Sequence, residues 1–301
     1  MAKDFNSLLK MAKKQGPKIL AVACAHDEDV LQSSKMAMAE GLIIPILVGD
    51  KVTIQQIADR IELNLDGVRI IHEVDKTKAS RIATELVSKG EAHILMKGLV
   101  DTSIIMKQVL DPEIGLRAGK LISHVAVFHL PTYHKVFLVT DAAMNIAPDL
   151  SQKKDIIENA VELAKAFDID MPKVAVLAAK EKVSPKMEAT VHAQELAKMN
   201  QEGLIKGCIV DGPFALDNAI SKESAKIKGI ESPVAGDADI LLTPDIEAGN
   251  ILYKALSFLA RAKSAGIILG AKAPIVLTSR ADDEDAKLNS IMLSVLMAAR
   301  N

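Results

Sequence analysis

Short apolar runs alternate with longer amphipathic segments along almost the whole chain, and this alternation limits the folds that the chain can adopt. A short apolar run is typical of a buried strand, and apolar residues spaced by three and four are typical of a helix. Strands separated by helices form βαβ units, which build mostly parallel sheets. The expected strands lie at 19–24, 42–48, 68–72, 92–96, 123–130, 135–140, 173–178, 208–210, 238–242, 266–269 and 274–277. The expected helices span 29–40, 53–60, 77–89, 102–110, 153–167, 184–199, 246–263 and 283–300.

The number of strands bears on the domain organisation. About eleven strands are many for one open sheet, so we predict two α/β domains with mostly parallel sheets and a cleft between them. A polar break at 131–134 and the glycine-bounded segment 266–270 are candidate borders. With these borders, residues 1–130 and 267–301 form a discontinuous first domain, and 131–266 form the second.

Composition argues against several functional classes. Aromatic residues make up only 3% of the chain and the net charge is -2, so neither base stacking nor a basic footprint for nucleic acid is expected. No apolar run approaches the ~18 residues of a membrane span, and the N-terminus is too polar for a signal peptide. Cys24 and Cys208 both lie in apolar runs, which indicates buried thiols in a reducing compartment. We therefore expect a cytoplasmic protein with no membrane contact.

Common cofactor motifs are missing from the sequence. The seven histidines are scattered and none lies in an HExxH motif, so we predict no metal site. The first strand is not followed by a GxGxxG turn, which argues against an ordinary dinucleotide site. Neither a Walker loop nor a GxSxG nucleophile elbow occurs.

Polar residues follow the last expected strand, where Thr278, Ser279 and Arg280 come directly behind the apolar run 273–277. Ligands of open α/β sheets bind just beyond the carboxyl ends of strands. An arginine fork matches a pair of phosphate oxygens, and a serine hydroxyl can donate to or accept from a reacting group. The alternative is a serine that caps the next helix beside a surface arginine. Similar polar stretches at 211–214 and 243–250 favour the functional interpretation.

Two further strand ends carry candidate binding residues. Lys97 and Gly98, with Thr102 at a helix start, could bind an anion through backbone N–H groups and the lysine charge. The alternative is a turn with a solvated lysine. Asn145 could hydrogen-bond a ligand or simply tie down its loop. Asp245 and Glu247 most simply stabilise a helix start through its dipole.

Five motifs occur in the order that they have in a known family. The chain resembles the phosphate acetyl/butyryl transferases over nearly its whole length. The matching stretches are 97–102, 140–145, 210–213, 244–254 and 279–280. The short length and the stretch 211–219 are more similar to the phosphate butyryltransferase branch than to the acetyl branch.

This resemblance implies a reversible acyl transfer, in which butyryl-CoA and inorganic phosphate give butyryl phosphate and CoA. It implies two α/β domains with the architecture of isocitrate and isopropylmalate dehydrogenases, the first domain being discontinuous. Members of the family are homodimers or larger homo-oligomers. Coenzyme A is a substrate, no cofactor stays bound, and an acyl (butyrate) kinase would be coupled to the reaction.

The resemblance also assigns catalytic residues. Ser279 matches the serine that assists near the thiol, and Arg280 matches a phosphate-binding arginine. A carboxylate should follow as the base for the CoA thiol, whose ordinary pKa is about 8.5. Ala286 stands at the family's aspartate, and Asp285 or Asp283 could replace it. We favour Asp285.

Binding residues follow from the same motifs. Lys97, Gly98, Thr102, Asn145 and Asn250 match binding positions of the family. Arg117 is expected to bind phosphate. Arg261 is expected to replace a family arginine on the long helix, where this chain has Phe258 and where a residue three positions on shares the same face.

Two other classes of protein were weighed against the transferase. A dehydrogenase of the same architecture would need metal-binding aspartates and a nucleotide loop, and the sequence shows neither. A non-catalytic CoA or acyl phosphate sensor would tend to lose Ser279 or Arg280, and both are present. Within the transferases, a pocket separates acyl groups that differ by one methylene by only ~1–3 kcal/mol. Acetyl, propionyl, butyryl and branched acyl groups therefore stay open.

Overall fold

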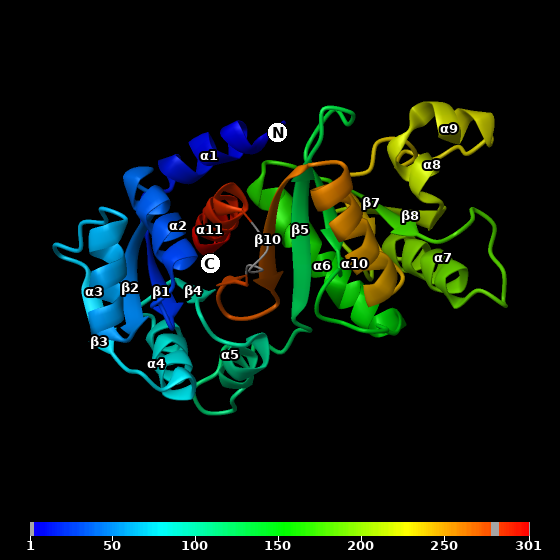
Figure 1. Cartoon of the computed structure of the whole chain (residues 1–301). Helices are drawn as coiled ribbons and strands as arrows, with labels where there is room; N and C mark the ends of the chain where they lie inside the picture. Colours follow the sequence, from blue (N-terminus) through cyan, green and yellow to red (C-terminus); the bar gives the residue numbers. More distant parts are fainter. Residues whose placement is uncertain (1–2, 278–282, 301) are drawn as a thin grey trace. The chain divides into compact units, whose positions relative to one another are not determined.

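The computed structural model describes residues 3–277 and 283–300 and divides the chain into two compact units (Figure 1). Unit 1 comprises Met1–Phe5 and Leu121–Ser264, and unit 2 comprises Asn6–Lys120 and Ala265–Asn301. The chain thus leaves unit 2 after Lys120 and returns to it at Ala265. The domain borders inferred from the sequence, after residues 130 and 266, remain a prediction.

Unit 2 has a mostly parallel sheet with the strand order β3-β2-β1-β4-β11-β10. Only β10 runs antiparallel, beside β11. Its strands are β1 (Lys18–Ala23), β2 (Ile43–Gly49), β3 (Arg69–His72), β4 (Ile94–Lys97), β10 (Lys263–Leu269) and β11 (Ile275–Val276). Its helices are α1 (Phe5–Lys14), α2 (Glu28–Ala39), α3 (Lys51–Arg60), α4 (Lys76–Ser88), α5 (Thr102–Val109) and α11 (Glu284–Ala298).

Aspartates start most helices of unit 2. The side chains of Asp27, Asp50, Asp75 and Asp283 accept hydrogen bonds from backbone N–H groups in the first turns of α2, α3, α4 and α11. Such caps satisfy N–H groups that have no partner within the helix, and each contributes about 1 kcal/mol. The turns from β1, β2 and β3 into α2, α3 and α4 are thereby fixed at the edge where the parallel strands end, which we call the carboxyl edge.

The strands of unit 1 also run mostly parallel, in the order β5-β6-β9-β7-β8, with β5 antiparallel to β6. Its strands are β5 (Ser123–His129), β6 (Phe137–Thr140), β7 (Lys173–Leu177), β8 (Ile209–Phe214) and β9 (Ile240–Leu242). Its helices are α6 (Leu150–Ala166), α7 (Glu188–Gln201), α8 (Leu216–Ile220), α9 (Lys222–Ile227) and α10 (Ile246–Lys254), which continues as a π-helical turn over Ala255–Leu259.

The core of unit 1 forms on the sheet face that α10 covers. Phe128, Phe137 and Leu241 are buried there, with Leu252 of α10 and Leu256 of the π turn packed against them. The rings of Phe128 and Phe137 stack with centroids 5.8 Å apart. Burying side chains of this size contributes about 1.5–3 kcal/mol each, so this packing holds α10 in place.

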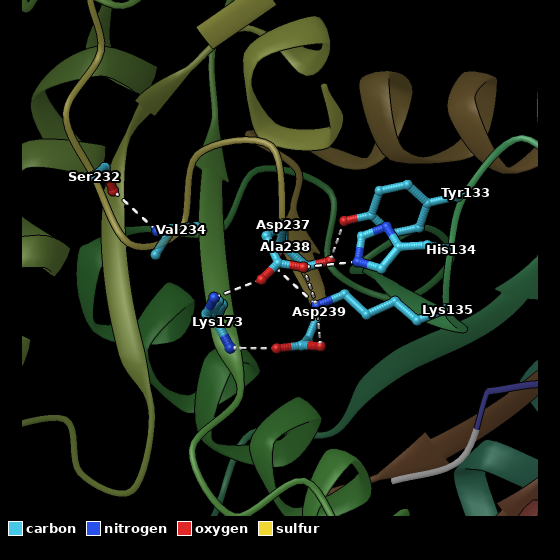
Figure 2. A network of polar contacts seen from close by, with 9 residues as sticks. All are labelled: Tyr133, His134, Lys135, Lys173, Ser232, Val234, Asp237, Ala238 and Asp239. Atoms are coloured by element: carbon cyan, nitrogen blue, oxygen red, sulfur yellow. Dashed lines mark hydrogen bonds and ion pairs between the residues drawn. The ribbon is translucent and has the colours of Figure 1, made fainter. Parts of the chain in front are cut away.

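Charged residues form a network at the opposite, amino edge of the unit 1 strands (Figure 2). Lys135 precedes β6, Lys173 opens β7, and Asp237 and Asp239 precede β9. The Lys135 ammonium lies 2.6 Å from Asp239 Oδ1 and 3.0 Å from Asp237 Oδ1. Lys173 pairs with the other oxygen of Asp237 and also donates its backbone N–H to Asp239. The network therefore joins the starts of three neighbouring strands.

The α/β class with mostly parallel sheets is confirmed, and each expected strand has its counterpart. Three helices, α1, α8 and α9, were not predicted. The helix expected from residue 184 begins only at Glu188. Ser184 lies before the helix, and its backbone N–H donates to Oγ1 of Thr190 in the first turn, 2.9 Å away. The strand expected to end at residue 210 continues to Phe214, whose carbonyl accepts from Ala178 N–H.

The predicted end of the long helix at 246–263 is also wrong. The α-helical part stops at Lys254, the π turn stops at Leu259, and Lys263 already belongs to β10. Arg261 has a φ of 49°, a left-handed conformation that ends a helix. The apolar pattern continues past this point, so it did not reveal the break. Among the residues described, no helix is long and apolar enough to cross a membrane.

Candidate active site

The strand order of unit 2 reverses direction between β1 and β4. β1 is followed along the chain by β2 and β3 on one side, whereas β4 and β11 lie on the other. In an open α/β sheet, the crevice at such a reversal is the usual place for a ligand. The turn that leaves β4 begins at Lys97, which lies beside Ala23 at the end of β1. The predicted anion site at Lys97 and Gly98 therefore falls at this reversal.

Gly98 makes the closest backbone approach in this crevice. Its N–H donates to the Ala23 carbonyl over 2.8 Å, and the next N–H donates to Cys24. A Cβ at position 98 would overlap the Cys24 carbonyl and lie 2.6 Å from that of Ala23. Only glycine fits. The Lys97 ammonium donates to the carbonyls of Gly98 and Val100, at 3.3 and 3.2 Å, and is thereby held over its own turn.

The helix after this turn offers exposed donors. Thr102 is the first residue of α5 and is exposed. The N-cap residue Asp101 makes no side-chain cap hydrogen bond, unlike the aspartates before α2, α3 and α4. The N–H groups of a helix start favour an anion. Lys97, Gly98 and Thr102 are thus brought together at one turn.

Cys24 also lies in this crevice but is a poor nucleophile. It is fully buried with a φ of 54°, and burial raises the pKa of its thiol. A thiol rather than a thiolate is inert in acyl transfer. Cys208 is likewise buried and unbridged, so both thiols are buried as predicted.

The remaining predicted residues of unit 2 are Arg117 and the residues that follow β11 in the sequence. β11 runs parallel to β4 with Val276 beside Met96, so the two strands end at the same edge. Ser279 and Arg280, which follow β11 in the sequence, lie outside the described residues. Arg117 is exposed, and its Nε donates to the Leu110 carbonyl over 2.6 Å.

The two candidate bases at the start of α11 differ in their hydrogen bonding. Asp283 accepts from the Ala286 N–H over 2.7 Å and caps the helix. Asp285 lies in the first turn and is exposed. The carboxylate already engaged by the backbone is therefore Asp283, which supports the preference for Asp285.

In unit 1, the loop after β6 is built around Asp141. This carboxylate is buried and accepts from four donors: the backbone N–H groups of His124, Ala143 and Met144, at 3.2, 2.8 and 3.0 Å, and the Asn145 amide at 2.6 Å. Charge-assisted bonds of this kind are stronger than neutral ones. The loop 141–145 is therefore fixed by a single side chain.

Asn145 uses both amide hydrogens inside the protein. It donates to Asp141 and to the Ile122 carbonyl, the latter over 3.0 Å. The alternative in which it ties down its own loop thus describes the observed geometry, and only its oxygen could meet a ligand.

The start of α10 packs directly on this loop. A Cβ at Gly249 would overlap the Asp141 carbonyl and lie 2.7 Å from Thr243 Oγ1. Thr243 Oγ1 lies 3.0 Å from the same carbonyl, and the exposed Asn250 donates to Ala142 over 3.2 Å. The two motifs at 140–145 and 244–254 are thus in contact. Gly249 and Asn250 place α10 against the loop.

Arg261 and Asp141 show where sequence reasoning fell short. Arg261 is exposed but lies beyond the end of α10 and its π turn, not on the helical face expected from Phe258. The central role of Asp141 was missed. An aspartate directly after a strand and before small residues is typical of a turn closed by its own side chain, and that signal could have revealed it.

Comparison with known proteins places the chain in a family. Residues 72–295 match the model of the phosphate acetyl/butaryl transferases. The chain belongs to this family. It is therefore an acyltransferase, as the resemblance implied, and the dehydrogenase alternative is excluded.

The names of similar proteins specify two different acyl groups. A phosphate butyryltransferase of Clostridium beijerinckii is 48% identical over 301 residues, covering 100% of both chains. A phosphate acetyltransferase of Thermotoga maritima is 50% identical over 294 residues, covering 98% of this chain and 99% of its own. These nearly equal identities do not by themselves choose an acyl group.

Solved structures agree with the fold. The crystal structure of a branched-chain phosphotransacylase from Enterococcus faecalis has a TM-score of 0.83 at 34% identity, covering 93% of this chain and 99% of its own. A putative 4-hydroxythreonine-4-phosphate dehydrogenase from Salmonella typhimurium has a TM-score of 0.57 at 12% identity, covering 93% and 99%. The latter shows the fold alone and agrees with the expected dehydrogenase-like architecture.

Proposed function

We propose that this protein transfers a butyryl group reversibly between CoA and inorganic phosphate. The observation that carries the proposal is the full-length similarity to the Clostridium beijerinckii phosphate butyryltransferase, together with the turn at Lys97 and Gly98 at the reversal of the unit 2 sheet. The second candidate is transfer of an acetyl group, which the similarity to the Thermotoga maritima phosphate acetyltransferase favours.

The proposed reaction is a direct attack in a ternary complex. A phosphate oxygen attacks the thioester carbon, the carbonyl oxygen becomes an oxyanion, and collapse of this intermediate breaks the C–S bond. The CoA thiolate leaves and takes a proton. Donors aimed at an oxyanion contribute on the order of 10²–10³ in rate. We assign this task to Ser279, near the sulfur and the developing charge.

Phosphate binding is assigned to the cationic groups of unit 2. Phosphate has a charge of about -1.5 at pH 7 and needs charged donors. Arg280 provides a two-point grip, and Lys97 provides a charge above the Gly98 turn. The exposed start of α5 at Thr102 and the guanidinium of Arg117 are the additional contacts.

Asp285 is the proposed proton carrier. In the direction of acyl-CoA synthesis it removes the proton of the CoA thiol, and in the opposite direction it returns that proton to the leaving thiolate. Its exposure at the start of α11 supports this assignment. Asn145, Asn250 and Arg261 are the proposed substrate-binding residues of unit 1.

Further properties belong to the same proposal. We infer a homodimer or larger homo-oligomer in the cytoplasm, with CoA as a substrate and no bound cofactor. The acyl phosphate produced would be consumed by an acyl kinase, which transfers the phosphoryl group and conserves the energy of the mixed carboxylic–phosphoric anhydride bond.

The decisive experiment measures release of the CoA thiol from butyryl-CoA with and without phosphate, beside acetyl-CoA. Phosphate-dependent release that is faster with butyryl-CoA is the expected result. Equal or faster release from acetyl-CoA would replace the butyryl proposal by the acetyl one. Absence of release from either substrate would overturn the transferase and favour an acyl-CoA or acyl phosphate sensor.

The variant Arg280→Ala tests the phosphate assignment in the same assay. We expect the KM for phosphate to rise more than the KM for acyl-CoA. An unchanged KM for phosphate would remove Arg280 from the phosphate site.

A further inference from the structure

A buried lysine lies at the start of α6 in unit 1. Lys153 is only 3% exposed, and its Nζ lies 2.9 Å from Nδ1 of His192 on α7. Burying a charge is costly unless it is compensated, so the surroundings of this ammonium must hold it in place. Neither residue has a role in the transfer as proposed above.

Carboxylates at three helix starts act on the charge of this ammonium. Glu188 is the first residue of α7, Asp245 is the N-cap of α10, and Asp149 is the N-cap of α6. The charges of all three favour the protonated form of Lys153, although burial lowers its pKa overall. The starts of α6, α7 and α10 therefore each contribute a negative charge that favours the ammonium form of Lys153.

The start of α6 is joined to the frame formed by α10 and the Asp141 loop. α6 begins at Leu150, shortly after Asn145, and the Ile246 N–H at the start of α10 donates to the Ile146 carbonyl over 2.9 Å. Asp245 accepts from the Ala248 N–H over 2.8 Å, one residue before Gly249. Gly249 and Asn250 then contact the loop 141–145. A shift of the Asp245 cap would therefore be transmitted to the loop that carries Asn145.

The pair exists only while His192 is neutral. A lysine ammonium has donors and no acceptor, so Nδ1 of His192 accepts and the ring hydrogen is on Nε2. Protonation would place an N–H on Nδ1, facing the ammonium at 2.9 Å. The hydrogen bond would be lost and two cations would repel each other.

The groups that face His192 are Lys153 from α6, Glu188 from its own helix, and Asp149 from the loop before α6. Nε2 lies 4.0 Å from a Glu188 oxygen. Burial and then the Lys153 charge lower the pKa of His192 below its ordinary 6.5, while Glu188 and Asp149 oppose this. The neutral ring is thus the form present at neutral pH.

We propose that Lys153 and His192 are positioning residues for the unit 1 binding loop, and that protonation of His192 releases the loop and lowers acyl transfer. The effect on transfer rests on the proposed function, whereas the pairing itself does not. A fall in pH would then slow the enzyme through a group that touches no substrate.

The test compares the pH dependence of kcat/KM for wild type with that of His192→Gln. The glutamine amide oxygen can accept from Lys153 and does not titrate. We expect the wild-type kcat/KM to fall once the pH drops below the pKa of folded His192, which lies below the ordinary value of 6.5, and then by about tenfold per pH unit. We expect His192→Gln to retain activity at pH 7.5 within about threefold and to lose this acid limb. An unchanged acid limb in His192→Gln would overturn the proposal.

Three further variants test the role of Lys153: Lys153→Met, Lys153→Arg and the control Lys154→Met. Lys154 is the next residue of α6 and pairs on the surface with Glu158 at 2.7 Å, so Lys154→Met removes the same charge without touching the pair. We expect Lys153→Met to lower kcat/KM about tenfold at pH 7.5, Lys153→Arg to restore most of it, and Lys154→Met to match wild type. A loss of equal size in Lys153→Met and Lys154→Met would overturn the positioning role.

A readout without catalysis separates this inference from the proposed function. Histidine side-chain NMR reports the tautomer and the titration of His192. We expect the hydrogen on Nε2, a pKa below 6.5 in wild type, and a higher pKa in Lys153→Met. These results with no acyl transfer would refute the function and keep the pair. A His192 titration that is unaffected by Lys153→Met would refute the pair, even with full transferase activity.

Discussion

The two edges of the unit 1 sheet use buried charge differently. At the amino edge, Lys135 and Lys173 are matched by Asp237 and Asp239, lysine to carboxylate, across three strands (Figure 2). At the carboxyl edge, the buried carboxylate of Asp141 is matched by N–H groups of its own loop and of β5. The amino edge fixes strands, and the carboxyl edge fixes a loop.

This difference indicates what each edge can contribute. Charge pairs between strand ends stabilise the fold, but their charged groups bind one another and not a substrate. A carboxylate that collects backbone N–H groups fixes a loop conformation, and loops at the carboxyl edge are where open α/β sheets bind ligands. Matched substitutions at the two edges should therefore separate stability from catalysis.

The largest effect is expected for Asp141→Asn. The amide nitrogen cannot accept, so about two of the four hydrogen bonds to the carboxylate are lost, at about 1.5–3 kcal/mol each before relaxation. We expect the free energy of unfolding to fall by about 3 kcal/mol or more, and kcat/KM of the folded protein to fall by up to about 10²-fold as the loop shifts. Urea unfolding and initial rates measure the two effects. A rate loss without a stability loss would contradict the structural role of Asp141.

Asp239→Asn is the matched substitution at the amino edge. Asp239 is buried and pairs with Lys135, but Asp237 also contacts Lys135 and partly compensates for the loss. Breaking a buried pair costs about 3–5 kcal/mol, and we expect a value near or below the lower limit. The kcat/KM of the folded fraction should stay within about twofold of wild type. A clear loss of kcat/KM at a temperature where the protein is fully folded would refute the division between the edges.

Gly249→Ala tests the contact between α10 and the loop through its sign. In an exposed helix interior, replacing glycine by alanine stabilises by about 1 kcal/mol. At this position the new Cβ meets the Asp141 carbonyl and Thr243 Oγ1, so we expect a destabilisation of about 1–3 kcal/mol. A thermal melt and kcat/KM should both decrease. A higher melting temperature would show that α10 does not need this close approach.

Local patterns predicted most of the fold. The strands were found because each one is a short apolar run, and most helices because their apolar residues recur at helical spacing. α8 and α9, with five and six residues, are too short to show a period of 3.6. The end of α10 was missed because apolar residues continue through the π turn, while the break depends on the conformation of Arg261.

Sequence reasoning proposed site residues only where position along a strand was sufficient. Lys97, Gly98 and Asn145 lie at strand ends, so a general rule made them candidates. The buried Lys153 meets His192, 39 positions away, and a sequence does not show such a pair. Gly249 looked like a motif residue, whereas its need for space is set by the Asp141 carbonyl more than 100 residues earlier. The local pattern of apolar and polar residues does not reveal long-range contacts of this kind.

The smallest effect is a difference in the pH range over which each edge loses stability. Burial tends to raise the pKa of Asp237, but hydrogen bonds from Lys173, Lys135 and His134 outweigh it and lower the pKa below its ordinary value. Such a carboxylate stabilises the fold above the unfolded pKa of about 3.9, and this stabilisation is lost as the pH falls through the lower, folded pKa. The stabilisation from the amino edge should therefore persist until the pH is strongly acid.

The carboxyl edge should respond earlier. The pKa of His192 is lowered, so the unfolded chain takes up a proton near pH 6.5 while the folded chain does not. Stability should thus decrease as the pH falls from 6.5 toward the folded pKa, and be fully present above 6.5. Urea midpoints measured from pH 3 to pH 8 should show His192→Gln flattening the upper part of this range and Asp237→Asn flattening only the part near and below about pH 4. Both variants changing the same part of the curve would mean that the two edges titrate as one network, and the comparison between them would fail.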